Sequence, residues 1–426
     1  MHLKALQKIT THPLIRLSSL NSLSVLTRVA GGFLASKMIA IFIGPSGMAL
    51  TGSLRNFLTS VDTYATLGLQ NGIIKYTAEY QKDREKLKEV ITTTFLTIFI
   101  ATLVCAALLS LPAIYWSKWV FNGADNYTWV FRTLGFILPL YIGNMIFTAA
   151  LSGLGKYRQV IFLNIFGNIF GVLLSAVLIW KYGIDGAFLG LIFSPVIVLL
   201  LSCYPLYKEL DGFSFLSTKY FNTALLKNLA SFSLMSLVTA LLGPAIYITL
   251  RNLIADHSGI AEAGFYEGIN RISSFYLMFA TTLLTVYFLP GLSQAATDGQ
   301  VKAIFRSYYK IVVPLFSAGL LLVYLLKGFI IRVTLSQDFL PMDKLFIWQL
   351  LGDFFKVCSL ILGQEFFARK MTRTYIITEI TSFLVLYTSG LFLIKLYGSE
   401  GAVMAHAVTY GVYFVVLAVI FRKKLF

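Results

Sequence analysis

The stretch Tyr182-Gly183-Ile184-Asp185-Gly186-Ala187 separates two long apolar runs and recurs 215 residues later as Tyr397-Gly398-Ser399-Glu400-Gly401-Ala402. Arg158 and Arg373 are related by the same offset, and Gly52-Ser53-Leu54-Arg55 matches Gly268-Ile269-Asn270-Arg271 at an offset of 216. Three matches at nearly one offset indicate an internal repeat. The sequence therefore predicts two halves of similar fold.

The composition of the 426-residue chain indicates a membrane protein. Hydrophobic residues make up 57% of the chain and charged residues 13%, and the mean hydropathy is +0.77. A soluble protein of this size carries about a quarter of charged residues. Because a membrane-spanning helix needs about 20 residues, the apolar stretches predict twelve spans, near 17–43, 47–74, 90–111, 129–151, 159–180, 186–207, 229–253, 263–290, 307–327, 345–367, 374–396 and 402–421.

Lys and Arg are distributed unevenly between the loops that join these spans. Alternate loops, together with the two ends of the chain, hold 22 of them, whereas the loops on the opposite side hold six. Basic residues accumulate on the cytoplasmic side of membrane proteins. Both termini are therefore predicted to be cytoplasmic, and the net charge of +16 needs no nucleic-acid partner to explain it.

The longest segment between predicted spans on the basic side, residues 208–228, lies at the midpoint of the chain. It divides an N-terminal six-helix bundle, residues 1–207, from a C-terminal six-helix bundle, residues 229–426. Because each half has an even number of spans, the two copies begin on the same side. We expect an all-α polytopic fold with two bundles related by a pseudo-twofold axis along the membrane normal, around a central cavity.

Twelve charged residues fall inside the predicted spans. A charge at the centre of a lipid-facing helix costs about 2.5 to 3.5 kcal/mol on insertion scales, so these residues are expected to pair inside the bundles or to line a polar cavity. Arg132 lies near a span end and is expected to anchor the helix at the interface. The predicted substrate-binding residues are Arg28, Lys37, Arg55, Arg251, Arg271 and Lys356, and the predicted ion-coupling or ion-pair residues are Asp62, Glu267, Asp353, Glu365 and Glu379.

Helical spacing predicts which of these charges share a helix face. Glu267 and Arg271 are four residues apart, and Asp353 and Lys356 are three apart, so each pair lies on one face. Two interpretations stay open for each pair, an ion pair that locks the helices together or a site that takes part in transport. The excess of Arg over acid favours an anionic substrate such as a pyrophosphate, because guanidinium groups suit phosphate and stay charged when buried.

Other features predict no catalytic chemistry. Cys105, Cys203 and Cys358 lie in separate apolar runs, as packing residues do, and no metal-ligand spacing occurs. No phosphate-binding Gly-Lys-Ser/Thr loop is present in the sequence. We therefore expect neither an enzyme nor a cofactor, metal or ATP requirement. His406 could relay protons, but a single His on an apolar helix is more often a hydrogen-bonded packing residue.

Several blocks of sequence resemble the Wzx-type flippases of lipid-linked oligosaccharides, which include the O-antigen translocases and the flippases of enterobacterial common antigen. The resemblance covers essentially the whole chain and is most specific in five blocks, Lys37–Gly47, Leu54–Phe57, Asn71–Tyr76, Tyr287–Pro290 and Trp348–Val357. It implies the fold of the multidrug, oligosaccharidyl-lipid and polysaccharide exporters.

The resemblance also implies a function in surface-polysaccharide assembly. Such flippases move undecaprenyl-pyrophosphate-linked glycan between the leaflets of the bacterial cytoplasmic membrane. Arg28, Lys37 and Arg55 match basic positions of the family, and Asp353 with Lys356 fits its pattern. Some relatives have a small polar residue in place of Arg271, and His406 matches nothing typical of the family.

The expected partners are the lipid-linked glycan and membrane lipids, with a polysaccharide polymerase and a chain-length regulator as candidate protein partners. The alternative within the transporter class is a cation-coupled multidrug exporter on the same fold, whose cavity should be acidic. A membrane glycosyltransferase or polymerase would need a long extramembrane loop, and the longest outward segment, 112–128, is short. A scramblase or purely structural role is a further alternative.

Overall fold

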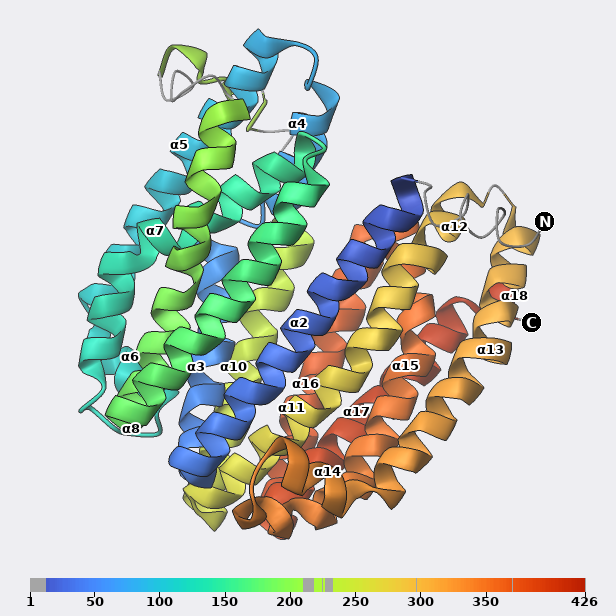
Figure 1. Ribbon diagram of the computed structural model, residues 1–426. Helices are drawn as coiled ribbons and strands as arrows, with labels where there is room; N and C mark the ends of the chain where they lie inside the picture. Colours follow the sequence, from blue (N-terminus) through green and yellow to red (C-terminus); the bar gives the residue numbers. More distant parts are fainter. Residues whose placement is uncertain are drawn as a thin grey trace, which may run out of the picture. The chain divides into compact units, whose positions relative to one another are not determined.

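The computed structural model describes residues 13–209, 218–223, 225–226, 233–295, 297–369 and 371–425, and every element along these residues is helical. The central part of the expected linker, around residues 210–217, lies outside the described residues. Figure 1 shows the helices in chain order. They are α2 (Pro13–Phe42), α3 (Gly44–Ala65), α4 (Gln70–Glu79), α5 (Arg84–Ser110), α6 (Ala113–Val120), α7 (Thr128–Gly153), α8 (Tyr157–Glu209), η2 (Thr218–Tyr220), α10 (Ser233–Ser258), α11 (Ile260–Leu283), η3 (Leu284–Phe288), α12 (Leu289–Gln294), α13 (Asp298–Leu325), α14 (Lys327–Thr334), η4 (Gln337–Leu345), α15 (Phe346–Ala368), α16 (Thr372–Tyr397), α17 (Ser399–Ile420) and α18 (Arg422–Leu425).

The protein is an all-α, multi-pass membrane protein. Over the described residues, nine helices are long and apolar enough to cross a membrane. The helices α3 and α11 are not among the nine, and they carry several of the charges that the sequence places within spans, Arg55 and Asp62 on α3 and Glu267 and Arg271 on α11. The all-helical membrane fold is thus confirmed, whereas the total of twelve spans stays a prediction.

The chain divides into two compact units that interleave in sequence. The first comprises residues 1–38, 58–119 and 123–240, and the second comprises 39–57, 120–122 and 241–426. In the first unit, α7 packs against α4, α5 and α8; in the second, α17 packs against α15, α16 and α11. The first half of α3 therefore belongs with the helices of the C-terminal part of the chain. The bundle boundaries expected at 208–228 stay a prediction.

The helix α8 is a hairpin rather than a straight rod. It is interrupted only at Gly183, where φ is 57° and ψ is −125°. A Cβ atom added at Gly171 would touch Ser194, and one added at Gly190 would touch Ser175, so the two arms run antiparallel at close range. The loop expected between spans 159–180 and 186–207 is thus reduced to a sharp turn at one residue.

The same turn occurs again between α16 and α17. Gly398 has φ 59° and ψ −133°, which is a backbone conformation that only glycine adopts readily. Three residues after each turn, a Cβ on Gly186 would strike the carbonyl of Leu178, and one on Gly401 would strike that of Leu393. The repeated Tyr-Gly-x-acid-Gly-Ala motif therefore encodes one local structure twice.

The helix α10 contains an interior proline, Pro244. Proline has no backbone N–H, so the carbonyl four residues earlier loses its usual helical donor. That carbonyl, on Ala240, accepts a hydrogen bond of 2.7 Å from the Ser60 hydroxyl of α3. A side chain thus satisfies the backbone group that the proline leaves free.

The tight turn motif gives a matched pair of glycine variants within α17. We expect Gly401→Ala to destabilise the protein by about 1 to 3 kcal/mol, because the new methyl group overlaps the backbone of α16. Gly411→Ala should be neutral or slightly stabilising, since the nearest atom to its Cβ, on Phe355, is 3.8 Å away. Thermal unfolding of the purified variants in detergent measures the difference, and equal unfolding temperatures would contradict the close approach.

Candidate functional site

Three helices of the second unit bring arginine side chains to one place. α3 contributes Arg55, α10 contributes Arg251, and α11 contributes Arg271. On α11, Glu267, Asn270, Arg271 and Ser274 follow one another at helical spacing and so share a face. The other two helices meet this face, which makes α11 the centre of the candidate site.

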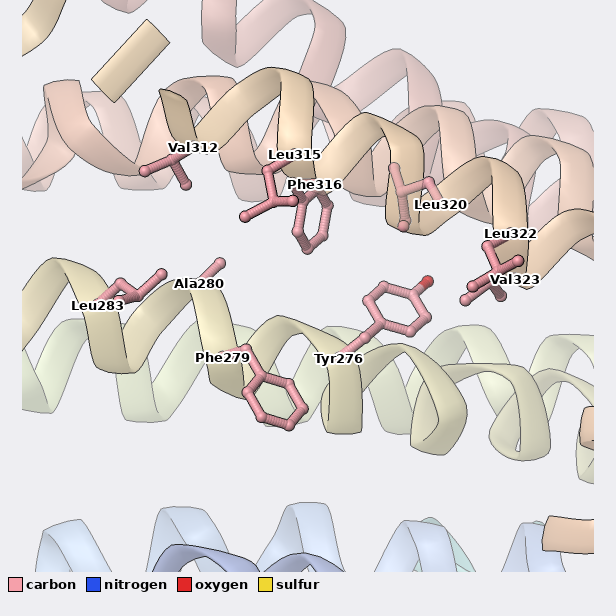
Figure 2. A pocket seen from close by; sticks show the side chains of 11 residues that line it. Tyr276, Phe279, Ala280, Leu283, Val312, Leu315, Phe316, Leu320, Leu322 and Val323 are labelled. Atoms are coloured by element: carbon pink, nitrogen blue, oxygen red, sulfur yellow. The ribbon is translucent and has the colours of Figure 1, made fainter. Parts of the chain in front are cut away.

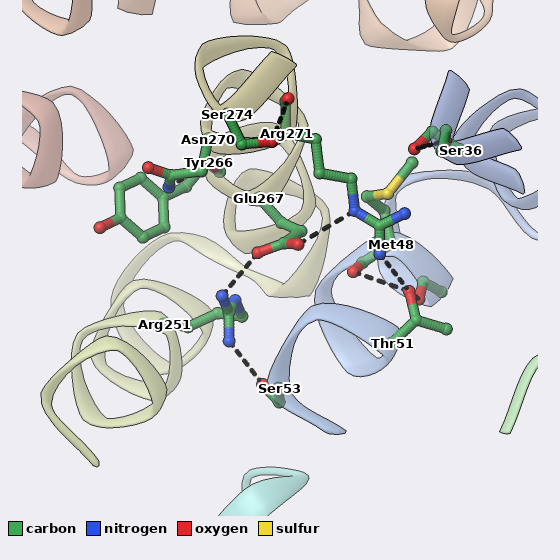
Figure 3. A network of polar contacts seen from close by, with 12 residues as sticks. Ser36, Met48, Thr51, Ser53, Arg251, Tyr266, Glu267, Asn270, Arg271 and Ser274 are labelled. Atoms are coloured by element: carbon green, nitrogen blue, oxygen red, sulfur yellow. Dashed lines mark hydrogen bonds and ion pairs between the residues drawn. The ribbon is translucent and has the colours of Figure 1, made fainter. Parts of the chain in front are cut away.

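Glu267 is the anion that holds two of these arginines. Its Oε2 accepts a hydrogen bond of 2.6 Å from Nη2 of Arg251, and its Oε1 accepts one of 3.0 Å from Nε of Arg271. Figure 3 shows the carboxylate lying between the two guanidinium groups. Both arginines and the glutamate are buried. The structure thus contains the Glu267–Arg271 ion pair that the spacing favours, and adds Arg251 from a neighbouring helix.

Small residues of α3 let these side chains reach their positions. A Cβ at Gly52 would overlap the side chain of Glu267, so glycine leaves the space that the carboxylate occupies. Ser53 accepts a hydrogen bond of 3.0 Å from Nη1 of Arg251, and Thr51 accepts one of 3.2 Å from Nη2 of Arg271. The segment 51–53 therefore orients both guanidinium groups.

The arginines line a cavity of about 190 Å³, together with neutral polar side chains. Its charged lining consists of three guanidinium groups, those of Arg55, Arg251 and Arg271, and one carboxylate, that of Glu267. The cavity is therefore net positive. The Nε of Arg251 is buried and has no hydrogen-bond partner among the described residues. A cavity with this charge and a spare donor is suited to bind an anion.

Arg55 and Arg271 occupy equivalent positions of the internal repeat, and both line this cavity. Arg55 is partly buried, while Arg271 is buried. The repeat therefore supplies the site with one arginine from each copy.

Asp353 does not form the ion pair with Lys356 that their spacing favours. Its buried carboxylate accepts hydrogen bonds from Ser273 (2.6 Å) and Tyr276 on α11, from Gln349 (3.2 Å) on α15, and from Nε2 of His406 (3.0 Å) on α17. Of the two interpretations left open for Asp353 and Lys356, the ion pair is not observed among the described residues, because these partners already surround Asp353. The ammonium group of Lys356 instead lies 4.9 Å from the centre of the Tyr410 ring.

His406 is thus a buried hydrogen-bonded residue, in agreement with the simpler of its two interpretations. A Cβ on Gly352 would overlap the imidazole, so glycine at this position allows α15 and α17 to approach. Sequence reasoning did not connect His406, Gln349, Ser273 or Tyr276 to Asp353. The only local signal was the four-residue spacing of Gln349 and Asp353, since the other partners come from different helices.

The remaining predicted residues lie elsewhere. Asp62 is in the first unit, where one oxygen lies 3.4 Å from the Tyr141 hydroxyl and Oδ1 is buried with no hydrogen-bond partner among the described residues. Arg28 is exposed and Lys37 half-buried on α2. Both belong to the first unit.

Glu365 and Glu379 belong to the second unit but not to the arginine cavity. Glu365 is fully buried and forms ion pairs with Arg369 (3.2 Å) and Lys424 (2.7 Å), so it ties the end of α15 to α18. Glu379 is half-buried on α16. The acids that the sequence groups together thus occupy distinct environments.

A separate cavity of about 360 Å³ lies between α11 and α13 and is apolar. Figure 2 shows Ala280, Leu283, Leu315 and Phe316 among the side chains around it. Leu315 is 70% exposed, as expected for a side chain in contact with lipid tails. No charged side chain in the described part of the chain lines this cavity, so it does not suit an anion. The residues of α11 that line it are not those that line the arginine cavity.

Residues 17–296 match the family model described as "Polysaccharide biosynthesis protein". The chain belongs to this family of multi-pass membrane proteins. It is 31% identical over 393 residues to the Lipid III flippase of Escherichia coli (strain K12), which covers 92% of this chain and 94% of that protein. The Lipid III flippase of Shigella flexneri gives the same values. The resemblance to flippases of lipid-linked oligosaccharides is therefore confirmed.

Solved structures of related fold include two kinds of transporter. An inward-facing multidrug resistance MATE family transporter of the MOP superfamily aligns with a TM-score of 0.79 at 14% identity, over 94% of each chain. The lipid II flippase MurJ in an inward closed conformation aligns with a TM-score of 0.70 at 14% identity, over 96% of this chain and 89% of that one. At this identity the likeness establishes the fold, which is the exporter fold that the sequence implies.

The role of Glu267 as the shared counter-ion is testable by a neutral replacement. We expect Glu267→Gln to destabilise the protein by about 3 to 5 kcal/mol, because it leaves buried guanidinium groups without their carboxylate. Glu85→Gln is the matched control, since Glu85 forms a more exposed ion pair of 3.8 Å with Lys88, and surface pairs contribute about 0 to 1 kcal/mol. Thermal unfolding in detergent compares the two, and shifts of similar size would show that Glu267 does not hold the arginines.

Proposed function

We propose that this protein is a flippase that moves an undecaprenyl-pyrophosphate-linked oligosaccharide from the cytoplasmic to the periplasmic leaflet of the bacterial cytoplasmic membrane. The cargo is the repeat unit of a surface polysaccharide, such as O-antigen. Transport proceeds by alternating access, and the protein performs no covalent chemistry on its cargo. The family, the Lipid III flippase relatives and the transporter fold support this assignment.

The observation that carries the proposal is the basic cavity of Arg55, Arg251 and Arg271. A pyrophosphate that is esterified at both ends keeps one negative charge on each phosphoryl group. Three guanidinium groups and the carboxylate of Glu267 leave two positive charges in excess, which match that anion. Guanidinium groups also bind phosphoryl oxygens through paired hydrogen bonds. The pyrophosphate would therefore bind here, where the Nε of Arg251 offers an unused donor.

The other parts of the cargo need different surroundings. The glycan is rich in hydroxyl groups and would cross the membrane in the polar interior, whereas the polyprenyl chain would stay in lipid. Exposed apolar residues of α11 and α13, such as Phe279 and Leu322, are compatible with lipid contact. Arg28 and Lys37 of α2 are proposed to contact the anionic cargo at another stage of transport, and Lys356 is proposed to contact the glycan part of the cargo within the second unit.

The proposed source of energy for transport is an ion gradient. The alternative source is consumption of the transported lipid on the far side of the membrane. Asp62 and Asp353 are the acids proposed for coupling, while Glu267, Glu365 and Glu379 are proposed to act in ion pairs or in coupling. Both termini are proposed to be cytoplasmic, from the distribution of Lys and Arg. A polysaccharide polymerase and a chain-length regulator are the proposed protein partners, and ATP and nucleic acid have no proposed role.

The second candidate function is cation-coupled drug export, which the MATE family neighbours suggest at the level of fold alone. A cavity for cationic drugs should be net acidic. The basic cavity of the second unit therefore favours the flippase.

Deletion of the gene tests the proposed function directly. We expect a polyprenyl-pyrophosphate glycan to accumulate while surface polysaccharide disappears, because the cargo is made on the cytoplasmic side and cannot cross. Mass spectrometry of extracted lipids detects the accumulated species and identifies its sugars. Intact surface glycan together with increased drug sensitivity would instead support the exporter.

The basic cavity is testable by complementing that deletion with an Arg55 variant. We expect Arg55→Gln to weaken binding of the cargo by about tenfold or more, which corresponds to about 1.4 kcal/mol of lost interaction, and so to reduce surface polysaccharide. Arg55 is only partly buried, so its replacement should leave the amount of protein in the membrane unchanged. Lys118→Gln removes an exposed positive charge on α6 and should have no effect. Normal surface glycan with Arg55→Gln would overturn the assignment of the cavity.

A further inference from the structure

A second polar cavity, of about 330 Å³, lies next to the arginine cavity in the second unit. The two cavities share three lining residues, Tyr247 of α10 and Asn270 and Ser274 of α11. The second cavity extends to α15 and α17, where Gln349, Lys356 and His406 line it. Its volume falls within the range of about 300 to 1,000 Å³ that is typical of small-molecule sites, and it exceeds that of the arginine cavity.

The chemistry of this cavity differs from that of its neighbour. The side chains around it are hydroxyls, amides, one phenol, one imidazole and one amine, together with apolar residues. Asp353 stands behind this lining with a side chain that is completely buried. A cavity of this composition suits a ligand with many hydrogen-bonding groups.

The unused hydrogen-bonding atoms indicate what such a ligand must supply. A carboxylate only accepts hydrogen bonds, so Gln349 must turn its amide N–H groups toward Asp353. Its carbonyl oxygen, Oε1, is buried and has no partner among the described residues. In a neutral imidazole whose Nε2 donates to Asp353, Nδ1 of His406 is an acceptor, and it too is buried without a described partner. The cavity thus offers acceptors that a hydroxyl or N–H donor would satisfy, and a fully ionised pyrophosphate has no donors.

The position of the cavity agrees with the covalent structure of the proposed cargo. The first sugar is joined to the pyrophosphate through a single oxygen atom, so its ring must lie directly beside the phosphate site. The shared residues Tyr247, Asn270 and Ser274 stand at that junction. Lys356, whose ammonium group lies over the Tyr410 ring, contributes donors for the ring oxygen and hydroxyl oxygens.

We infer that this cavity is the binding subsite for the sugar attached to the pyrophosphate. Gln349 accepts a hydrogen bond from the sugar, and Lys356 donates one to it. This inference rests on the proposed function and adds to it a recognition of the glycan that is separate from recognition of the pyrophosphate. The protein should therefore bind the glycosylated lipid more tightly than the bare lipid pyrophosphate.

Binding of two lipids to the purified full-length protein tests the subsite. The probes are the polyprenyl-pyrophosphate glycan extracted from the deletion strain and undecaprenyl pyrophosphate, which lacks the sugars. We expect the wild type to prefer the glycosylated lipid by about tenfold or more. Lys356→Met and Gln349→Met should each lose most of that preference and keep the affinity for undecaprenyl pyrophosphate. Arg55→Gln should weaken the binding of both lipids, because both carry the pyrophosphate.

The controls separate recognition from folding. Gln294→Met changes an exposed glutamine of α12 and should leave both affinities unchanged. Gln349→Met also removes a donor to Asp353 and so could unfold the protein. Between the described residues Lys356 and Asp353 there is no hydrogen bond, so Lys356→Met loses none. If Gln349→Met unfolds, the binding data for Lys356→Met alone test the sugar subsite.

Each outcome has a distinct meaning. Equal affinity of the wild type for the two lipids, or an unchanged preference in Lys356→Met, would overturn the sugar subsite and leave the flippase assignment intact. Failure of the deletion strain to accumulate any lipid-linked glycan would instead overturn the proposed function on which the subsite rests.

Discussion

The carboxylate of Glu267 is the interaction on which the candidate site depends. Guanidinium groups stay ionised when they are buried, and two of them, on Arg251 and Arg271, are almost completely withdrawn from the surface. Without a shared anion, their mutual repulsion and loss of hydration would oppose the packing of α3, α10 and α11. Because one carboxylate serves two arginines and Arg55 lines the same cavity, the arrangement is held together and still has positive charge in excess. A stable fold and an anion site are thus obtained from one set of residues.

The helix α11 contributes residues to the charged site and to two further, chemically different environments. Its Glu267, Asn270, Arg271 and Ser274 line the arginine cavity, Ser273 and Tyr276 bind Asp353, and Ala280 and Leu283 line the apolar cavity. The helix therefore changes from charged to neutral polar to apolar along its length. A cargo made of a pyrophosphate, sugars and a polyprenyl chain has the same three kinds of surface.

The sequence predicted well what depends on local spacing and composition. Apolar runs located the helices, the four-residue spacing of Glu267 and Arg271 predicted their shared face, and the repeated stretch at 182–187 and 397–402 marked where one helix ends and the next begins. It could not predict that Arg251 of α10 joins Glu267, or that His406 of α17 binds Asp353, because those contacts join residues 16 and 53 positions apart. The same limit explains why the spacing of Asp353 and Lys356 left open whether the two residues pair. Spacing brings two residues to one face, but partners from other helices decide which of them interact.

The interleaving of the two units has a mechanical consequence. Three of their boundaries, at residues 38/39, 57/58 and 240/241, fall inside the continuous helices α2, α3 and α10 rather than in loops. Bending a helix at such a point normally strains its backbone hydrogen bonds. In α10 the bond from residue 244 to residue 240 is already missing because of Pro244, and the Ser60 hydroxyl occupies its place. A rotatable side chain tolerates bending better than a helical N–H does, so this point of the chain combines a missing helical hydrogen bond with a carbonyl group that still has a partner.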